Sequence, residues 1–159
     1  MPDGYLIVNP TQAPESSPFY SVVQTIPVEN DGVWSEVWSQ TPVALALAQQ
    51  MAIANLAQAR YQAQTAPVTV DDVTINATSD SMTLLNSAIS SLGGSSTATI
   101  NFKAVSGWVQ LNLAQLQALS AAVNTQIQSC FTNEFNLTQQ IMALTDTPSV
   151  AAFDINTGW

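Results

Sequence analysis

The chain has 159 residues, of which only 8% are charged, and it carries a formal net charge of −9 with Arg60 and Lys103 as its two cations. So few basic side chains argue against binding to nucleic acid, whose phosphates require them, and against binding to anionic membrane surfaces. The chain contains no histidine, which excludes Ser-His-Asp catalysis and histidine metal sites. No phosphate-binding glycine loop is present, and no spacing of carboxylates singles out a catalytic pair. We therefore expect a protein that is not an enzyme, with no cofactor and no metal.

The first 18 residues predict an arm with little regular structure. Residues 4–8 favour a short strand, and Pro10, Pro14 and Pro18 then interrupt the backbone pattern that helices and sheets need. Such an arm is either a mobile terminus or a segment that orders on a partner. No basic region precedes an apolar stretch here, so no signal peptide is expected, and no apolar run approaches the length of a membrane span.

Two strands are predicted next. Residues 19–26 are rich in aromatic and β-branched side chains, and Asn-Asp-Gly at 30–32 favours a tight turn. Residues 33–38 then alternate, which predicts one strand with Trp34 and Trp38 on the same face. We interpret this pair as a packed face rather than a platform for sugars or bases, because no polar side chains converge on it. Trp34, Trp38 and Tyr20 are candidate protein-interface residues, and Trp159 is a fourth.

A helix is predicted from Pro42 to about Gln64, with Thr41 as its cap and proline in its first turn. Residues 65–67 break it. Residues 68–75 predict a hairpin that turns at Asp71 and Asp72. Those two neighbouring carboxylates lack the other oxygen ligands of a calcium loop, which disfavours a metal site.

A short helix is predicted over residues 80–92, capped at Thr78 and Ser79 and stopped by two glycines. Its core face would carry Met82, Leu85 and Ile89. Residues 100–105 and 108–111 favour strands separated by a turn at Ser106 and Gly107.

The longest helical pattern runs from Leu113 to about Leu144, with Asn112 suited to cap it. One apolar stripe recurs at Leu113, Leu116, Val123, Ile127, Cys130, Leu137, Ile141 and Leu144. We expect Cys130 to be a buried small apolar residue, since a lone cysteine forms no internal disulfide. Phe131 and Phe135 are predicted to widen the stripe. Ser120 and Glu134 interrupt its second row, so the helix packs either on its own domain or along a partner chain.

Residues 147–153 predict a final helical turn or two, and we expect Trp159 to dock in a groove. Together the elements predict an α+β fold, in which small antiparallel strands and hairpins pack on long helices, one of them of about 30 residues near the C-terminus. We divide the chain into residues 1–66, an attachment part, and residues 67–159, a compact α+β unit.

The stretch Phe-Lys-Ala-Val-Ser-Gly-Trp-Val-Gln-Leu at 102–111 resembles the pattern "wK-x-x-x-G-x-v-x-L" of a domain of uncharacterised function found in tail and tail-fibre assembly proteins of tailed bacteriophages. Residues 128–134 are similar to its "V-Q-x-C-F-x-x-E" segment. The hairpin at 68–75, the Thr-Ser-Asp-Ser that follows it and the closing Gly-Trp also match that layout. The clear resemblance covers residues 68–159. Residues 31–38 resemble its "dG-x-W-x-x-x-W" element, although the helix at 42–64 lacks the usual charged residues.

The resemblance implies a non-enzymatic bacteriophage tail protein, a component of the fibre or baseplate that acts through contacts with other tail proteins. It would be made in the host cytoplasm and become part of the virion tail. The sequence leaves open whether it forms a homo-oligomer. One alternative is a tail-fibre assembly chaperone that is absent from the mature virion. A second is a receptor- or glycan-binding module, for which Trp108 and Trp159 are the aromatic residues of interest. The family carries no catalytic residues to transfer.

Overall fold

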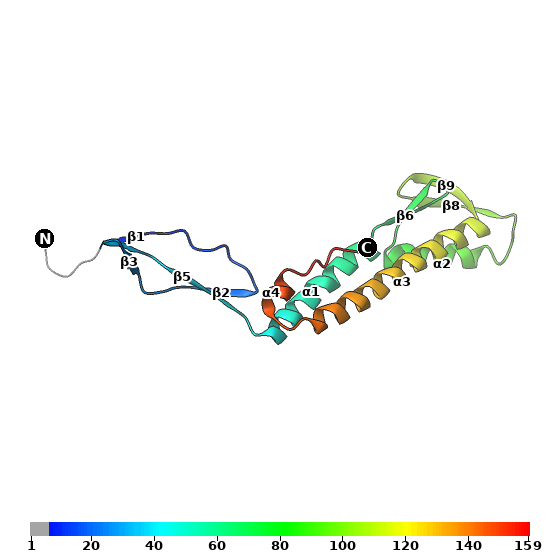
Figure 1. The fold of residues 1–159 in the computed structure, drawn as a ribbon. Coiled ribbons are helices and arrows are strands. Elements are labelled where there is room, and N and C mark those ends of the chain that lie inside the picture. The colour runs from blue at the N-terminus through cyan, green and yellow to red at the C-terminus, as the bar shows by residue number, and fades with distance from the viewer. Residues whose placement is uncertain (1–6) are drawn as a thin grey trace. The chain divides into compact units, whose positions relative to one another are not determined.

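The computed structural model describes residues 7–159 (Figure 1). Small strand pairs and four helices make up these residues, and the longest helix, α3 (Leu113–Ala143), has 31 residues. The α+β class and the long C-terminal helix are therefore confirmed. The chain forms two compact units, each discontinuous in sequence. The first unit contains residues up to Ala52 together with Ile141–Phe153, and the second contains Ile53–Gln140 together with Asp154–Trp159.

The first unit begins with five short strands, drawn in blue to cyan in Figure 1. They are β1 (Val8–Asn9), β2 (Tyr20–Gln24), β3 (Val28–Asn30), β4 (Val33–Ser35) and β5 (Trp38–Pro42). Strands β1, β4 and β3 form a three-stranded sheet in that order, and β2 pairs with β5. The predicted turn joins β3 to β4, where Asp31 and Gly32 both adopt positive φ as a tight hairpin requires. Of the strand predicted at 4–8, residues 4–6 lie outside the described residues.

The single strand predicted over residues 33–38 is wrong. Trp34 lies in β4, between β1 and β3, whereas Trp38 begins β5 and pairs with Gln24 of β2. The chain passes from one sheet to the other at residues 36–37. There the Glu36 N–H donates to the Asn9 carbonyl of β1, and the Val37 carbonyl accepts from the Thr25 N–H just after β2. The two tryptophans consequently belong to different sheets, which an alternating pattern alone does not reveal.

The predicted start of the first long helix is also wrong. Thr41 and Pro42 pair with Ser21 and Tyr20 at the end of β5, and the Val43 N–H extends this pairing to the Phe19 carbonyl. Helix α1 (Leu45–Gln64) therefore begins three residues after Pro42. The pairing with β2 takes precedence over the local capping signal. The predicted end at Gln64 is confirmed.

The helical part of the first unit packs around alanines. Ala48 and Ala52 of α1 are buried, as are Ile141 of α3 and Val150 of α4 (Thr147–Ala151). The Gln49 side-chain amide donates to the carbonyls of residues 141, 142 and 144 at 3.1–3.3 Å. It thereby satisfies carbonyls that the C-terminal end of α3 leaves without helical partners.

The second unit has its own core beneath two hairpins. Strands β6 (Pro67–Val70) and β7 (Val73–Asn76) form the first, and β8 (Thr99–Ala104) and β9 (Gly107–Asn112) form the second, with α2 (Ser79–Ser91) between them in sequence (Figure 1). Both predicted hairpins and the predicted helix are confirmed, although the turn of the second hairpin is at Val105 and Ser106, one residue before the predicted position, because Gly107 pairs with Ala104. Their apolar faces pack with the first half of α3 through Val73, Ile75, Ala77, Leu85, Ala88, Phe102, Ala104, Leu111, Leu116, Leu119 and Val123.

Helix α3 begins and packs much as its sequence predicts. The Asn112 side chain accepts from the Gln115 N–H while the Gln115 side chain accepts from the Asn112 N–H, both at 3.0 Å, which forms a reciprocal N-terminal cap. The stripe is buried at Leu116, Val123, Cys130, Leu137 and Ile141. Phe131 and Phe135, however, are 45% and 63% exposed, so the prediction that they widen the stripe is wrong.

Within the second unit, α1 and α3 lie antiparallel, and Gln126 of α3 joins them. Its side-chain amide donates to the carbonyls of Ala63, Gln64 and Ala66 at 3.0–3.3 Å, where α1 ends. Because an amide carries two hydrogens, it shares them among the three acceptors. The end of α1 is thus capped by a residue more than 60 positions later in the chain.

Candidate interaction site

Residues 7–42, which we call the strand segment, have no buried core. Every residue from 7 to 47 is at least partly exposed, and the first buried residue is Ala48. Its strands are two to five residues long, in one ladder of three and one of two. Such thin β-ribbons are only marginally stable in water unless an apolar face is covered. The strand segment is therefore the part of the structure that is least complete by itself.

The strand segment also exposes large apolar side chains. Ile7 and Ile26 are 86% and 84% exposed, and Val23, Val28 and Val33 each expose about half of their surface. Large apolar side chains that are exposed in one segment are candidates for contact with another protein. Spacing along the chain does not single out these aliphatic residues; the one local signal is that Ile26 directly precedes Pro27, between β2 and β3.

Three of the four predicted interface residues lie in this segment, and each is half-buried. Tyr20 is in β2 opposite Pro42, Trp34 is in β4, and Trp38 is in β5. The indole N–H of Trp38 is covered but finds no acceptor among the described residues. A buried donor without a partner costs free energy, so an acceptor that reached this N–H would stabilise the segment.

The strand segment is acidic. It contains four carboxylates, Glu15, Glu29, Asp31 and Glu36, and no lysine or arginine. Glu36 has a structural role, because its carboxylate accepts from the Thr11 N–H at 3.1 Å and its carbonyl accepts from the Thr11 hydroxyl at 2.9 Å.

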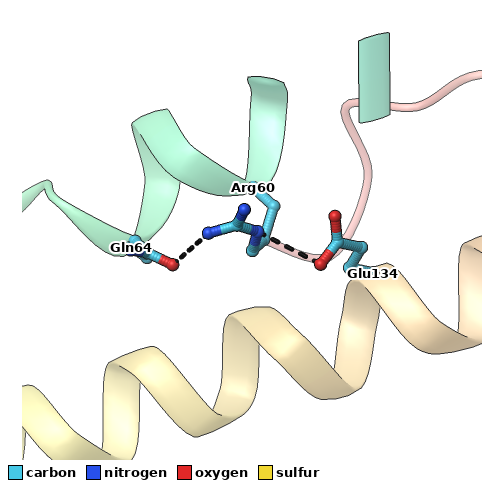
Figure 2. A network of polar contacts seen from close by, with 3 residues as sticks. All are labelled: Arg60, Gln64 and Glu134. Atoms are coloured by element: carbon cyan, nitrogen blue, oxygen red, sulfur yellow. Dashed lines mark hydrogen bonds and ion pairs between the residues drawn. The ribbon is translucent and has the colours of Figure 1, made fainter. Parts of the chain in front are cut away.

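The second unit contains the one ion pair found among residues 7–159. Arg60 of α1 places Nε 3.1 Å from Glu134 Oε2 on α3, donates to Gln64, and lies 4.9 Å from the centre of the Phe131 ring (Figure 2). Both charged side chains are about one-fifth exposed. Figure 2 shows the three polar side chains between the two helices, so the network joins helices rather than forming a reactive centre.

Trp159 lies at a hollow of about 620 Å³ between α1 and α3 in the second unit. Small residues line most of it, with Cys130 and Gln126 among them. Burial raises the pKa of the Cys130 thiol, and the nearby Arg60 lowers it by less. Cys130 is 5% exposed, which confirms the prediction that it is buried. A neutral, buried thiol of this kind is a packing residue and not a nucleophile.

The C-terminal tail is held against α3. The Asn133 side-chain amide donates to the Thr157 carbonyl at 2.8 Å, and the Trp159 indole N–H donates back to the Ile155 carbonyl at 2.9 Å. Gly158 has φ +80°, and a Cβ there would lie 2.7 Å from Asn133 Oδ1. Trp159 is 37% exposed, so its ring contacts the hollow but remains open to solvent on one side.

Within residues 7–159, no group of three or more acidic, cysteine or histidine side chains is placed to hold a metal ion. In the same part of the chain, no helix has the length and hydropathy needed to cross a membrane.

Comparison with family models matched residues 47–157 to the family described as "Domain of unknown function (DUF4376)". The chain belongs to this family. The match begins within α1 and includes both hairpins and nearly all of the tail, whereas the strand segment precedes it. No curated protein and no solved structure matched the chain in the corresponding comparisons.

Proposed function

We propose that this chain is a non-enzymatic component of a bacteriophage tail, which attaches to another tail protein through its strand segment. One observation carries the attachment: residues 7–42 include no buried residue, and Ile7 and Ile26, which lie just outside strands β1 and β2, are almost completely exposed. A ribbon of this kind gains its apolar burial when it packs on another protein. The phage assignment is supported by the motif resemblance around residues 102–111.

The chemistry of the attachment follows from the side chains of the strand segment. Val23, Val28 and Val33 would pack into an apolar surface, and the half-buried Trp34 and Trp38 would supply the large aromatic anchors that dominate many interfaces. The four carboxylates would lie at the edge of the contact and favour lysine or arginine on the tail partner.

The test is incorporation into virions. Phage particles are purified from cells that supply the wild-type chain, a chain without residues 7–42, or the Trp34→Ala/Trp38→Ala double variant, and the protein is quantified by mass spectrometry. Trp108→Ala is the matched control, because Trp108 is 73% exposed but lies on the β9 strand of the second unit.

We expect the wild-type and Trp108→Ala chains in the particles, and a loss of at least about tenfold for the two strand-segment variants, as removal of anchor residues produces. Equal incorporation of all four chains would contradict the proposal. A chain that assists assembly but never appears in wild-type particles would instead be the transient chaperone. A glycan array in which Trp108→Ala abolishes a reproducible signal would favour the receptor-binding alternative.

A further inference from the structure

Strand β8 has a free edge. The loop of the β8–β9 hairpin is two residues long, so Ala104 and Gly107 form the hydrogen-bonded pair that closes it. Hydrogen-bonded pairs alternate along an antiparallel ladder, and the backbone groups of Asn101 and Lys103 consequently face away from β9. Among the described residues β8 has no other strand partner. Just beyond its end, the Val105 N–H donates to the Thr74 carbonyl of β7.

A groove lies between this free edge and helix α2. A hollow of about 450 Å³ is lined by α2 residues from Leu84 to Ser91 and by residues 100–103 of β8. A second hollow of about 230 Å³ continues it toward β7 and shares Leu84, Phe102 and Lys103 with the first. Phe102 is buried in the floor, whereas Leu84 is 63% exposed on the α2 wall. The groove therefore combines unpaired backbone groups with an apolar wall.

We propose that this groove binds an extended segment of another protein, which adds to β8 as a third strand. Free N–H and C=O groups in a row are satisfied best by another strand. An apolar wall beside such an edge gives the incoming segment a place for alternate side chains, as in other grooves that bind peptides by strand addition. Residues 99–104 of β8 span about 20 Å at strand spacing, enough for a segment of about six residues.

The side chains around the groove specify the pattern of the bound segment. On β8, Phe102 and Ala104 face the core while Lys103 points to the outer face beside Trp108, 5.8 Å from its ring centre. A residue opposite Lys103 would lie on that outer face, where a carboxylate meets an ammonium that has no ion-pair partner among residues 7–159. Its two neighbours would point inward toward Leu84. The expected pattern is apolar, acidic, apolar.

The preference should be for one acidic residue and not for a run of them. Asp80 lies in the first turn of α2, four residues before Leu84 and on the same side of the helix. A second carboxylate in the bound segment, on the side of Leu84, would be repelled by the Asp80 carboxylate. This groove lies wholly in the second unit, whereas the strand segment lies in the first. Attachment through the strand segment and peptide binding at β8 are therefore tested independently.

The test uses the full chain and a displayed library of random ten-residue peptides. We expect selection on the wild-type chain to enrich peptides with the apolar–acidic–apolar pattern. Selection on Lys103→Glu should replace the acidic position by lysine or arginine, because the charge that selects it has been reversed. A helical or patternless set of peptides would overturn the proposal, as would the same acidic peptides on both chains.

Backbone pairing is tested with a pair of proline variants. Asn101→Pro removes an N–H from the free edge of β8 without removing a β8–β9 hydrogen bond. Gln110→Pro, its matched control, removes an N–H from the opposite free edge of the same hairpin. The enriched peptides should bind Asn101→Pro at least about tenfold more weakly than wild type and bind Gln110→Pro normally, as strand addition requires.

A third variant tests the apolar wall of the groove without a change to the backbone of β8. Leu84→Glu changes an exposed residue and should leave the circular dichroism spectrum unchanged, yet it places a charge on the apolar wall. It should also weaken peptide binding at least about tenfold. Unchanged binding to Leu84→Glu, or no peptide enrichment on the wild-type chain, would overturn the proposal.

Discussion

Arg60 Nε lies 3.1 Å from Glu134 Oε2, and this contact explains why an acidic residue interrupts the apolar row of α3. Both side chains are largely covered, and the guanidinium also contacts Gln64 and the Phe131 ring. Two of the few charged residues in the chain therefore join α1 and α3 within the second unit.

The first prediction removes one partner of this pair. Glu134→Ala leaves the Arg60 guanidinium mostly covered without its carboxylate, and should lower the free energy of unfolding by about 1–2 kcal/mol, below the cost for a fully buried pair because both side chains keep some contact with water. Urea unfolding at low salt measures the change. A double Arg60→Met/Glu134→Leu variant should recover most of the loss, and a cost below about 0.5 kcal/mol for Glu134→Ala would show that the pair is incidental.

Gln126 provides the second prediction. Gln126→Ala should cost about 1–3 kcal/mol of unfolding free energy, because it leaves the Ala63, Gln64 and Ala66 carbonyls without their shared donor. Gln128→Ala is the matched control, since that side chain is exposed two residues further along α3. Gln126→Glu should be at least as damaging as Gln126→Ala, because a carboxylate neither donates nor suits the C-terminal end of a helix. Equal stability of the Gln126 and Gln128 variants would contradict this role.

The third prediction concerns the tail. Gly158→Ala should release Trp159 from its hollow, because the new Cβ displaces the Asn133 side chain that holds the Thr157 carbonyl and because the backbone there needs a positive φ. Carboxypeptidase should then remove Trp159 several times faster than from the wild-type chain. Gly94→Ala shares the positive φ but has nothing within 4 Å of its Cβ position, so it serves as the control and should leave the tail protected.

The fourth prediction follows from the raised pKa of the Cys130 thiol. Iodoacetamide should modify Cys130 in the folded chain more slowly at pH 7.5 than in urea, because the thiolate is disfavoured and its sulfur is covered. The unfolded chain loses this proton first as pH rises, so Cys130 lowers folding stability above about pH 8.5 and has no effect below that value. Equal modification rates in the two states would show that the thiol is accessible.

Much of the second unit could be predicted from its sequence, because its signals are local. The Asn112 cap, the Asp71–Asp72 turn and the stripe through Leu116 and Val123 each depend on residues close in the chain. The exposed positions of Phe131 and Phe135 could not be read from spacing, since spacing does not show where the neighbouring helix covers α3; Phe131 lies beside the Arg60 guanidinium from α1.

The first unit was harder to predict because its pairing is not local. Strand β2 pairs with β5 although β3 and β4 lie between them in the sequence. This pairing places Thr41 and Pro42 in a strand despite their helix-capping signal. Tyr20 and Trp38 are placed by this pairing, and Trp34 by the separate pairing of β4 with β1 and β3, so alternation along the chain does not account for their half-buried state. The division at residues 66 and 67 separates an attachment part from a compact part, and it stays a prediction.

Amide hydrogen exchange on the isolated chain tests whether the strand segment needs another protein to complete its packing. If the strand segment depends on a partner for its burial, amides of residues 7–42 should exchange far faster than those of α3 between Leu116 and Ile141, because local opening there exposes no buried core. Protection of residues 7–42 as strong as that of α3 would mean that the segment is stable by itself, and would contradict the claim that another protein completes it.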